Sequence, residues 1–541
     1  MAPLRYALVS RRVVRPEDAA EPAAGCFPAS SAAAACEAVP LSPLDAFPFV
    51  RGMSVTMAYV YRRGLDEAAL AASLRNTLRR FPIVAGRLRR VARPEAHPLR
   101  AQLEVALCGA GVTLDVLDCD GSVSDFDPFA DDNWAVAGLH TCPRAVRRPA
   151  KVCPAIAPFD DLLAGAPLAR YRLTRLRCGG CVLGASFAHI LGDAASGLTF
   201  AEAWAAEHAA LATGSPAAAP RFGAPIFDRG VLVAATAPPP PEALPPSTAA
   251  HTAATRARLA ALAARVSLRR LAGRAVKALY DSVRSPATYY VLLPAADVAG
   301  ARAAAPGTSA NDVALGLGWA LLRRVRARGA AGDKAQPLLG PLRGTTSQGA
   351  DAAEHLLMQT ADLRRYTALP AAYFGNACWG ALLSVPAGAD SRSPLALARA
   401  CRARMTEFTD SAALFEQMAP MMHPDATSKA ASSLAALRLS CVPAFCDGVF
   451  SSVNYPPIWQ VQFGAGLPVW THHGIVPATP WGLALLPSRP GTGAPGDLIL
   501  CGTCPRAALP AVKAAAAALL LQLRSEAVAA TAPPAEAPPA E

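Results

Sequence analysis

The chain has 541 residues, of which 52% are hydrophobic and 17% are charged, so it is long enough for two packed domains and too apolar to be disordered. Its formal net charge is +12, but aromatic residues make up only 6% and no basic cluster is interleaved with them, which excludes the surface of a nucleic-acid-binding protein. Scattered arginines suit a phosphate-bearing co-substrate better.

The first residues predict a strand rather than a targeting segment. Residues 1–14 alternate apolar and charged side chains, unlike the continuous apolar centre of a signal peptide. No apolar run reaches the roughly 18 residues that cross a bilayer. The closest, residues 512–523, is interrupted by Lys513 and Gln522. We therefore expect a cytoplasmic protein without a transmembrane span.

The cysteines are expected to be free thiols. The chain has 14 of them, and disulfides are rare in proteins that are not secreted. Two Cys-x-x-Cys pairs, Cys178/Cys181 and Cys501/Cys504, could together supply four zinc ligands. However, the pairs lie far apart in the chain and each interrupts an apolar, strand-like run, where cysteine behaves as a small hydrophobic residue. We expect no metal site.

The first predicted elements follow an Ala-rich stretch. Leu-Ser-Pro-Leu-Asp at 41–45 predicts a turn, with Asp45 in a structural role, and residues 53–61 predict a strand. Asp66 has the place of a helix N-cap, and Pro82 ends that helix. One apolar stripe of the helix is formed by Leu70, Leu74, Leu78 and Phe81.

A histidine and an aspartate follow the clearest strand signal in the chain. The largely apolar run at 168–187 predicts one strand that enters a core. His189 and Asp193 come directly after it, four residues apart. Thr199 and Glu202 have the spacing of a capping box, which predicts a helix from Thr199. Side chains at such a junction can be held rigidly at the edge of a cavity, so this is the candidate chemical site.

The middle of the chain predicts a crossover between two domains. Residues 212–255 are rich in Pro and Ala and include four consecutive prolines at 238–241. Residues 256–280 then form a basic amphipathic stretch. Such a stretch suits a surface helix of its own domain, and peripheral contact with an anionic membrane is the alternative.

The second half again shows helix and strand signals. Ser309 and Asp312 have the spacing of a capping box, which predicts a helix that runs to Gly329. The other predicted elements are a strand at 289–293, a strand at 498–501, a helix at 509–524 and a disordered tail at 526–541.

Seven blocks of the chain, in order, resemble the BAHD acyltransferases, acyl-CoA-dependent enzymes with a His-x-x-x-Asp motif and a late Asp-Phe-Gly-Trp-Gly motif. His189 and Asp193 match the first motif, and residues 462–466 match the second imperfectly. The other matching blocks are Leu-Ser-Pro-Leu-Asp at 41–45, Ala-Gly-Arg-Leu at 85–88, Cys-Gly-Gly at 178–180, Thr-Ser at 308–309 and Tyr-Phe-Gly-Asn at 373–376.

The chain departs from the family pattern at four positions. Gln462 and Ala465 stand where the late motif usually has Asp and Trp. Ala194 follows the motif Asp where Gly is usual, and Val453 follows Ser452 where Trp is usual. The chain resembles a divergent member.

The resemblance implies an α/β fold of two domains with similar topology, like chloramphenicol acetyltransferase, each a mixed β-sheet flanked by helices, with a tunnel at their interface. We expect an N-terminal domain at 1–211 with the His-x-x-x-Asp motif and a linker at 212–255. We expect a C-terminal domain at 256–525 that carries the Tyr-Phe-Gly-Asn and late motifs. The tail at 526–541 would follow it. We also expect a monomer.

The resemblance implies transfer of an acyl group from acyl-CoA, the co-substrate, to the hydroxyl or amine of a small molecule, with no permanently bound cofactor. His189 is then the general base that returns its proton to the leaving thiolate. Asp193 is expected to pair with an arginine that braces the site. Arg364 is the first candidate, because it follows Asp362, and Arg323 is the second.

Other residues receive roles by the same resemblance. Asn376 and Ser452 are candidates for the substrate and CoA tunnel, and an ordinary turn role remains open for both. The late-motif residues expected to be structural are Gln462, Phe463, Gly464 and Gly466.

Three alternatives remain open. Gly-Ala-Ser-Phe-Ala at 184–188 approximates a nucleophile elbow, which would make the protein a serine hydrolase that uses Ser186. A non-catalytic protein on the same fold could bind acyl groups or CoA. The acyl donor could also be the phosphopantetheine of a carrier protein, as in related condensation-type folds.

Overall fold

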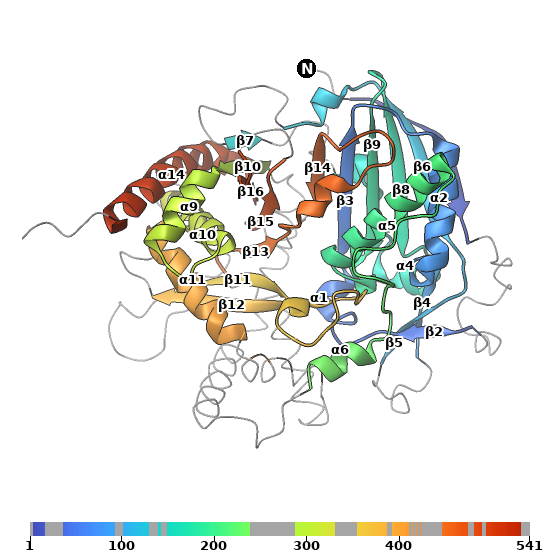
Figure 1. Ribbon diagram of the computed structural model, residues 1–541, viewed down its shortest axis with the longest axis horizontal. Coiled ribbons are helices and arrows are strands. Elements are labelled where there is room, and N and C mark those ends of the chain that lie inside the picture. Colours follow the sequence, from blue (N-terminus) through green and yellow to red (C-terminus); the bar gives the residue numbers. More distant parts are fainter. Residues whose placement is uncertain are drawn as a thin grey trace, which may run out of the picture.

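The computed structural model describes residues 4–16, 36–91, 101–128, 139–141, 149–237, 287–329, 354–386, 392–409, 446–473, 481–489, 494–531 and the single residues 414, 418 and 422. A six-stranded sheet and a seven-stranded sheet lie side by side, each with its own layer of helices (Figure 1). The fold class is therefore the predicted one, α/β with two mixed sheets flanked by helices.

The six-stranded sheet is built mainly from the first half of the chain. Its neighbours pair antiparallel except for β6 and β8, which are parallel. Its strands in spatial order are β1 (Tyr6–Val14), β6 (Val112–Cys119), β8 (Ala169–Leu176), β9 (Cys181–Ala188), β3 (Ser54–Tyr61) and β14 (Trp470–His473).

Two long helices, α2 (Glu67–Arg80) and α5 (Ala194–Thr213), pack against each other on this sheet. The predicted cap of α2 is confirmed, because Asp66 accepts from the Ala69 N–H at 2.7 Å. The predicted stripe is confirmed too, since its four side chains are fully buried: Leu70, Leu74, Leu78 and Phe81.

Two predictions around the His-x-x-x-Asp motif were wrong. The run at 168–187 is not one strand but the hairpin β8–β9, because Gly179 takes a positive φ of 84° that reverses the chain. Helix α5 begins at Ala194, with Asp193 as its N-cap, rather than at Thr199. The Thr199 hydroxyl donates to the Ala195 carbonyl inside the helix, so it caps nothing.

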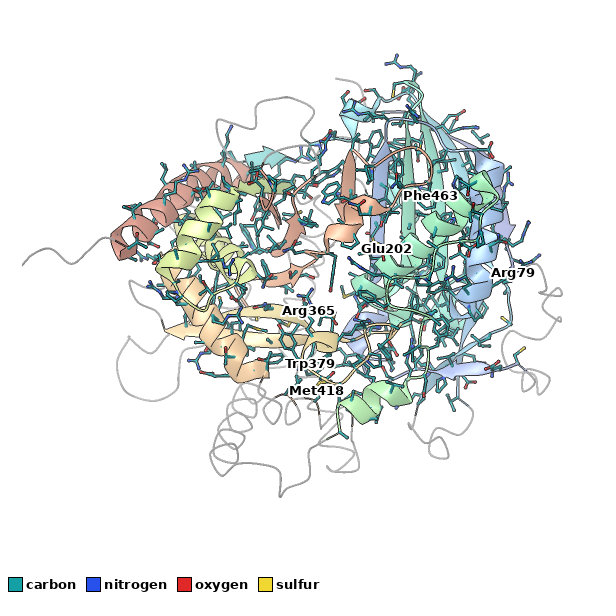
Figure 2. The ribbon with its side chains drawn as sticks, viewed as in Figure 1. Arg79, Glu202, Arg365, Trp379, Met418 and Phe463 are labelled. Carbon is teal, nitrogen blue, oxygen red and sulfur yellow. The ribbon has the colours of Figure 1, made fainter. Side chains whose placement is uncertain are left out.

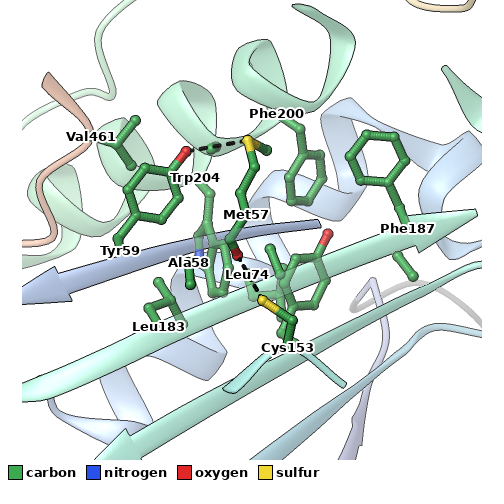
Figure 3. Close-up of a cluster of buried hydrophobic side chains, with 14 of the residues drawn as sticks. Met57, Ala58, Tyr59, Leu74, Cys153, Leu183, Phe187, Phe200, Trp204 and Val461 are labelled. Atoms are coloured by element: carbon green, nitrogen blue, oxygen red, sulfur yellow. Dashed lines mark hydrogen bonds between the residues drawn. The ribbon is translucent and has the colours of Figure 1, made fainter. Parts of the chain in front are cut away.

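The core beneath α5 is aromatic (Figure 3). Trp204 meets Tyr171 edge-to-face, with ring centroids 4.9 Å apart, and Phe200 stacks on Tyr171 at 5.8 Å. Gly197 allows α5 to approach β9, because a Cβ there would lie 2.5 Å from a ring carbon of Phe187. This close packing fixes the start of α5 against the end of β9.

The seven-stranded sheet belongs mainly to the second half of the chain. Its strands in spatial order are β12 (Cys378–Pro386), β11 (Glu354–Asp362), β13 (Val449–Ser452), β15 (Gly482–Pro487), β16 (Leu498–Cys504), β10 (Ala287–Leu293) and β7 (Leu139–Thr141). Strand β13 is parallel to both of its neighbours, and the other pairs are antiparallel.

Four helices accompany this sheet: α9 (Ala295–Ala304), α10 (Ala310–Gly329), α11 (Pro394–Thr409) and α14 (Leu509–Thr531). The predicted capping box of α10 is confirmed. The Ser309 N–H donates to the Asp312 carboxylate at 2.7 Å, and the Asp312 N–H donates to the Ser309 hydroxyl at 3.3 Å.

Each sheet contains one strand from the other half of the chain. β14, from residues 470–473, pairs with β3, and β7, from residues 139–141, pairs with β10. The predicted domain ranges 1–211 and 256–525 are therefore crossed by two strands. Such short strands carry no signal in the sequence that says which sheet they join.

The last helix differs from its prediction. α14 continues to Thr531, so residues 526–531 of the predicted disordered tail are helical, and Ala527 packs in the core; residues 532–541 lie outside the described residues. Residues 506–531 are also long and apolar enough, by length and composition alone, to cross a membrane, which the shorter run at 512–523 did not indicate. One face of this helix is buried in the protein, through residues such as Leu519 and Leu523.

The predicted linker is only partly described. Residues 214–237 are not a featureless crossover, since they contain α6 (Gly230–Ala235), and the Ile226 N–H donates to the Ala372 carbonyl at 3.0 Å. The rest of the linker, 238–255, and the basic stretch at 256–280 lie outside the described residues.

The described residues also form smaller elements. A three-stranded sheet contains β2 (Ala38–Pro40), β5 (Leu103–Ala106) and β4 (Arg87–Arg90). Three short helices are α1 (Pro48–Arg51), α3 (Pro149–Val152) and α4 (Phe159–Leu163).

Candidate active site

His189 lies where β9 turns into α5. A single 3-10 turn over His189–Leu191 joins the two elements. The His189 N–H donates to the Met53 carbonyl at 3.0 Å, which ties this turn to the chain just before β3. Burial lowers the pKa of His189 below its usual value, so the ring is neutral, and able to accept a proton, at neutral pH.

The His189 ring contacts the second half of the chain. Its Nδ1 lies 2.9 Å from Oδ1 of Asn376, the last residue of the Tyr-Phe-Gly-Asn block. The Asn376 amide nitrogen donates to the His189 carbonyl at 2.7 Å and to the Asp45 carboxylate at 2.9 Å. Three blocks that are far apart in the sequence therefore meet at one histidine.

The Asp193 carboxylate is occupied by other groups. Arg364 donates to both of its oxygens, at 2.9 and 3.2 Å, and the N–H groups of Ser196 and Ala377 donate at 3.0 and 2.9 Å. Burial alone would raise the pKa of Asp193, but the charge of Arg364 and these hydrogen bonds bring it below its usual value. Asp193 is thus an ionised brace in this geometry.

Arg364 is the partner that the sequence indicated, and the structure places it against Asp193 with only 7% of its side chain exposed. It also donates to Asp362 at 3.0 Å, and to the carbonyls of Tyr373 and Gly375 at 2.9 and 3.1 Å. The second candidate, Arg323, lies on α10 instead. Burial lowers its pKa, and the charge of Asp447 offsets part of that shift.

Ser196 adds another link that the sequence did not indicate. Its hydroxyl donates to the Gly375 carbonyl at 3.0 Å and accepts from the Gly375 N–H at 3.1 Å. The start of α5 is thereby joined to the turn that carries Asn376. The only sequence signal for Ser196 is its place three residues after Asp193, which suits a backbone N–H that an N-cap carboxylate accepts from.

A second buried ion pair lies beside Asn376. Arg229 donates through Nε to Asp45 at 2.8 Å, and neither side chain is exposed. The other guanidinium nitrogens donate to the carbonyls of Phe227, Leu191 and Phe374. The sequence indicated Asp45 as structural but missed Arg229, because it falls in the Pro/Ala-rich stretch interpreted as a linker.

Ser452 lies near this site but outside its hydrogen-bond network. It ends β13 and is half-buried, and among the described residues its side chain makes no hydrogen bond to His189. Tyr455, three residues later, donates to Asp362 at 3.2 Å, and the Arg365 guanidinium lies 5.6 Å from the Tyr455 ring centre. Figure 2 labels Arg365 on the side of the second sheet that faces the first.

The late motif anchors a segment of the second half on the first half. Phe463 is buried and meets Trp204 of α5 edge-to-face at 5.1 Å (Figure 2). Gly464 and Gly466 take positive φ values of 77° and 83°, which glycine adopts without strain. Gln462 is exposed. The motif therefore acts through packing and backbone shape.

Ser186, the alternative nucleophile, has no general base in this arrangement. It lies in β9 opposite Thr56 of β3, its side chain is buried, and its hydroxyl has no hydrogen-bond partner among the described residues. A serine nucleophile needs a base within hydrogen-bond reach. Within the described ranges, no group of three or more His, Cys, Asp or Glu residues could hold a metal ion.

Residues 26–281 match the profile of the Transferase family. Rosmarinate synthase of Plectranthus scutellarioides is 30% identical over 175 residues, which cover 32% of this chain and 34% of that protein. Putrescine hydroxycinnamoyltransferase 1 of Oryza sativa subsp. japonica is 30% identical over 222 residues, covering 39% of this chain and 44% of that protein. The matched regions thus span between a third and a half of these relatives.

Solved structures resemble the fold along most of its length. Vinorine synthase has a TM-score of 0.55 at 15% identity, covering 96% of this chain and 98% of its own. TRI101 of F. graminearum, complexed with coenzyme A and deoxynivalenol, has a TM-score of 0.53 at 13% identity, covering 88% and 97%. The first condensation domain of the CDA synthetase has a TM-score of 0.50 at 15% identity, covering 90% and 93%. At these identities the likeness concerns the fold.

Proposed function

We propose that the chain moves an acyl group from acyl-CoA to the hydroxyl or amine of a small molecule, because residues 26–281 match the Transferase family and the motifs resemble those of the BAHD acyltransferases. The observation that carries the proposal is the arrangement of His189 and Asp193. Asp193 is held by Arg364, whereas the His189 ring is neutral and has Asn376 as its side-chain partner among the described residues, so the histidine is the group equipped to move a proton.

The proposed reaction needs one base and no covalent enzyme intermediate. His189 takes the proton from the acceptor as its oxygen or nitrogen attacks the thioester carbonyl. The tetrahedral intermediate then collapses, the carbon–sulfur bond breaks, and the imidazolium gives the proton to the CoA thiolate. The brace of Asp193 and Arg364 keeps the histidine turn in place while this happens.

The relatives suggest which donors and acceptors to test first. Several are named hydroxycinnamoyltransferases, and the names of two of them include putrescine and 5-hydroxyanthranilate as acceptors. One solved structure with this fold, TRI101 of F. graminearum, is complexed with coenzyme A. We therefore propose hydroxycinnamoyl-CoA donors, with both amine and alcohol acceptors, as the first substrates.

The test is release of free thiol from a panel of acyl-CoAs in the presence of these acceptors. The proposal expects acceptor-dependent release of CoA and an acylated product seen by mass spectrometry. If CoA binds but no thiol is released from any pair, the non-catalytic reading is correct. Transfer only from an acyl-phosphopantetheine carrier protein would identify the carrier as donor.

The pH dependence of kcat/KM should show a loss of activity on the acid side. The base must be neutral, and burial lowers the pKa of His189 from its usual value, so activity should persist below about pH 6.5. It should fall only as pH drops further, through the lowered pKa. The measurement is kcat/KM between pH 4.5 and 8; an acid limb above the usual histidine pKa would contradict the assignment.

Ser186→Ala should keep near-normal turnover, because the buried hydroxyl contacts no base. The variant removes one oxygen from a site without hydrogen bonds, so its free energy of unfolding should change little as well. Thiol release and a thermal melt measure the two effects. Loss of turnover by orders of magnitude in a folded variant would favour the serine hydrolase instead.

A further inference from the structure

The hydrogen bonds of the Asn376 side chain define which atoms donate. Its Nδ2 contacts the Asp45 carboxylate at 2.9 Å and the His189 carbonyl at 2.7 Å. Both partners can only accept, so both protons of this amide are used and its orientation is fixed. The amide oxygen Oδ1 is therefore the atom that faces His189.

This orientation decides where the histidine proton lies. Oδ1 of Asn376 can only accept, and it is 2.9 Å from Nδ1 of His189. Nδ1 must then carry the proton, which leaves Nε2 of the neutral ring with a free lone pair. The other tautomer would set two acceptors against each other.

Asp45 holds Asn376 in this orientation from two sides. Its Oδ1 accepts from both the backbone N–H of Asn376, at 3.0 Å, and the side-chain amide. Its Oδ2 accepts from Arg229 at 2.8 Å, and from the N–H and hydroxyl of Ser42 at 3.0 and 2.8 Å. The carboxylate accepts five hydrogen bonds and cannot turn without breaking them.

Arg229 completes the chain of contacts. It is fully buried, pairs with Asp45 and donates to three carbonyls, one of which, Leu191, lies in the turn that carries His189. The same guanidinium donates to the Phe374 carbonyl, two residues before Asn376. The Arg229 guanidinium thus contacts both the turn that carries His189 and the turn that carries Asn376.

We propose that Asn376, oriented by Asp45 and Arg229, is a positioning residue that holds His189 in the Nδ1–H tautomer, with Nε2 as the basic atom. The inference deepens the proposed function and rests on it. The alternative is a purely structural role, in which Asn376 only anchors the turn at 373–376 to the rest of the protein. That alternative requires no particular tautomer and no effect on the pH dependence.

The tautomer can be measured without turnover. Long-range proton–nitrogen NMR of the protein labelled with ¹⁵N-histidine distinguishes the two ring protonation states, and the signal lost in His189→Gln identifies His189. The proposal expects the proton on Nδ1 at pH 7.5. A proton on Nε2 would overturn it, even if every acyl-CoA assay succeeded, and a proton on Nδ1 would support it even if no substrate were found.

The role of Asn376 is tested by Asn376→Ala, which keeps the backbone N–H bond to Asp45. We expect kcat to fall by about 10- to 100-fold, as for other groups that orient a working histidine, with KM changed less than about threefold. The lost hydrogen bond favoured protonated His189, so the acid limb of kcat/KM should move to lower pH. Asn76→Ala on α2 is the control and should change neither quantity.

A folded Asn376→Ala variant with unchanged kcat and an unchanged acid limb would overturn the positioning role. If that variant does not fold, Asn376→Ser takes its place, because its hydroxyl can still reach part of the polar surroundings. In Asn376→Ala the NMR experiment gives a second measurement: the proposal expects the Nε2–H form to appear, and a pure Nδ1–H signal would contradict it.

Discussion

Replacing His189 with alanine is expected to reduce turnover by about 10²- to 10⁴-fold, the usual worth of a general base. Of the neighbouring groups that could replace it, Asp193 is held by Arg364, and the Ser186 hydroxyl makes no hydrogen bond among the described residues. The fold should survive, since the lost ring makes one side-chain hydrogen bond. Initial rates of thiol release at saturating substrate measure the effect.

The control for this variant is His355→Ala, which removes a histidine at the far end of β11, where it lies 3.5 Å from Asp447. It should leave turnover within about twofold, because surface substitutions away from the site act weakly. Circular dichroism shows whether each variant is folded. Substantial turnover in folded His189→Ala would refute the general-base assignment.

Asp193→Ala should lower the free energy of unfolding by about 3–5 kcal/mol, the cost of removing one partner from a buried ion pair. The Arg364 side chain is only 7% exposed, so little solvent reaches the guanidinium that the carboxylate contacts. The N–H groups of Ser196 and Ala377 lose their acceptor as well, and α5 loses its N-cap. Turnover should fall too, because the turn of His189 is no longer fixed.

The matched control is an exposed ion pair. Arg404 and Glu407 pair on α11 with side chains 35% and 43% exposed, so Glu407→Ala should change the free energy of unfolding by only about 0–1 kcal/mol. Urea titration gives both values. If Asp193→Ala were as stable as the unaltered protein but as inactive as His189→Ala, Asp193 would act in proton transfer itself and the brace would be wrong.

Local signals predicted much of the fold. Asp66 and the Ser309–Asp312 pair cap helices as expected, because a short polar side chain before an apolar stripe satisfies helix N–H groups in any protein. Motif order, rather than local physics, pointed to Arg364 as the neighbour of Asp193. No pairwise rule connects residues 171 positions apart.

What could not be predicted depends on tertiary contacts. Helix α5 starts at Asp193 because its carboxylate caps the Ser196 N–H, and the capping-box spacing of Thr199 and Glu202 occurs without being used. Arg229 was missed because a buried arginine is stable only with a partner, and Asp45 lies 184 positions away. Composition placed Arg229 in a linker, whereas its contacts place it beside the site.

The exchanged strands have a consequence for any attempt to cut the chain in two. A fragment that ended before residue 287 would lack β14, so the backbone N–H and C=O groups along one side of β3 would have no partners, and the place of Phe463 against Trp204 would be empty. A fragment that began there would lack β7 beside β10. Unpaired strand edges attract other chains, so each piece alone should aggregate, and only co-expression of both pieces should yield soluble protein.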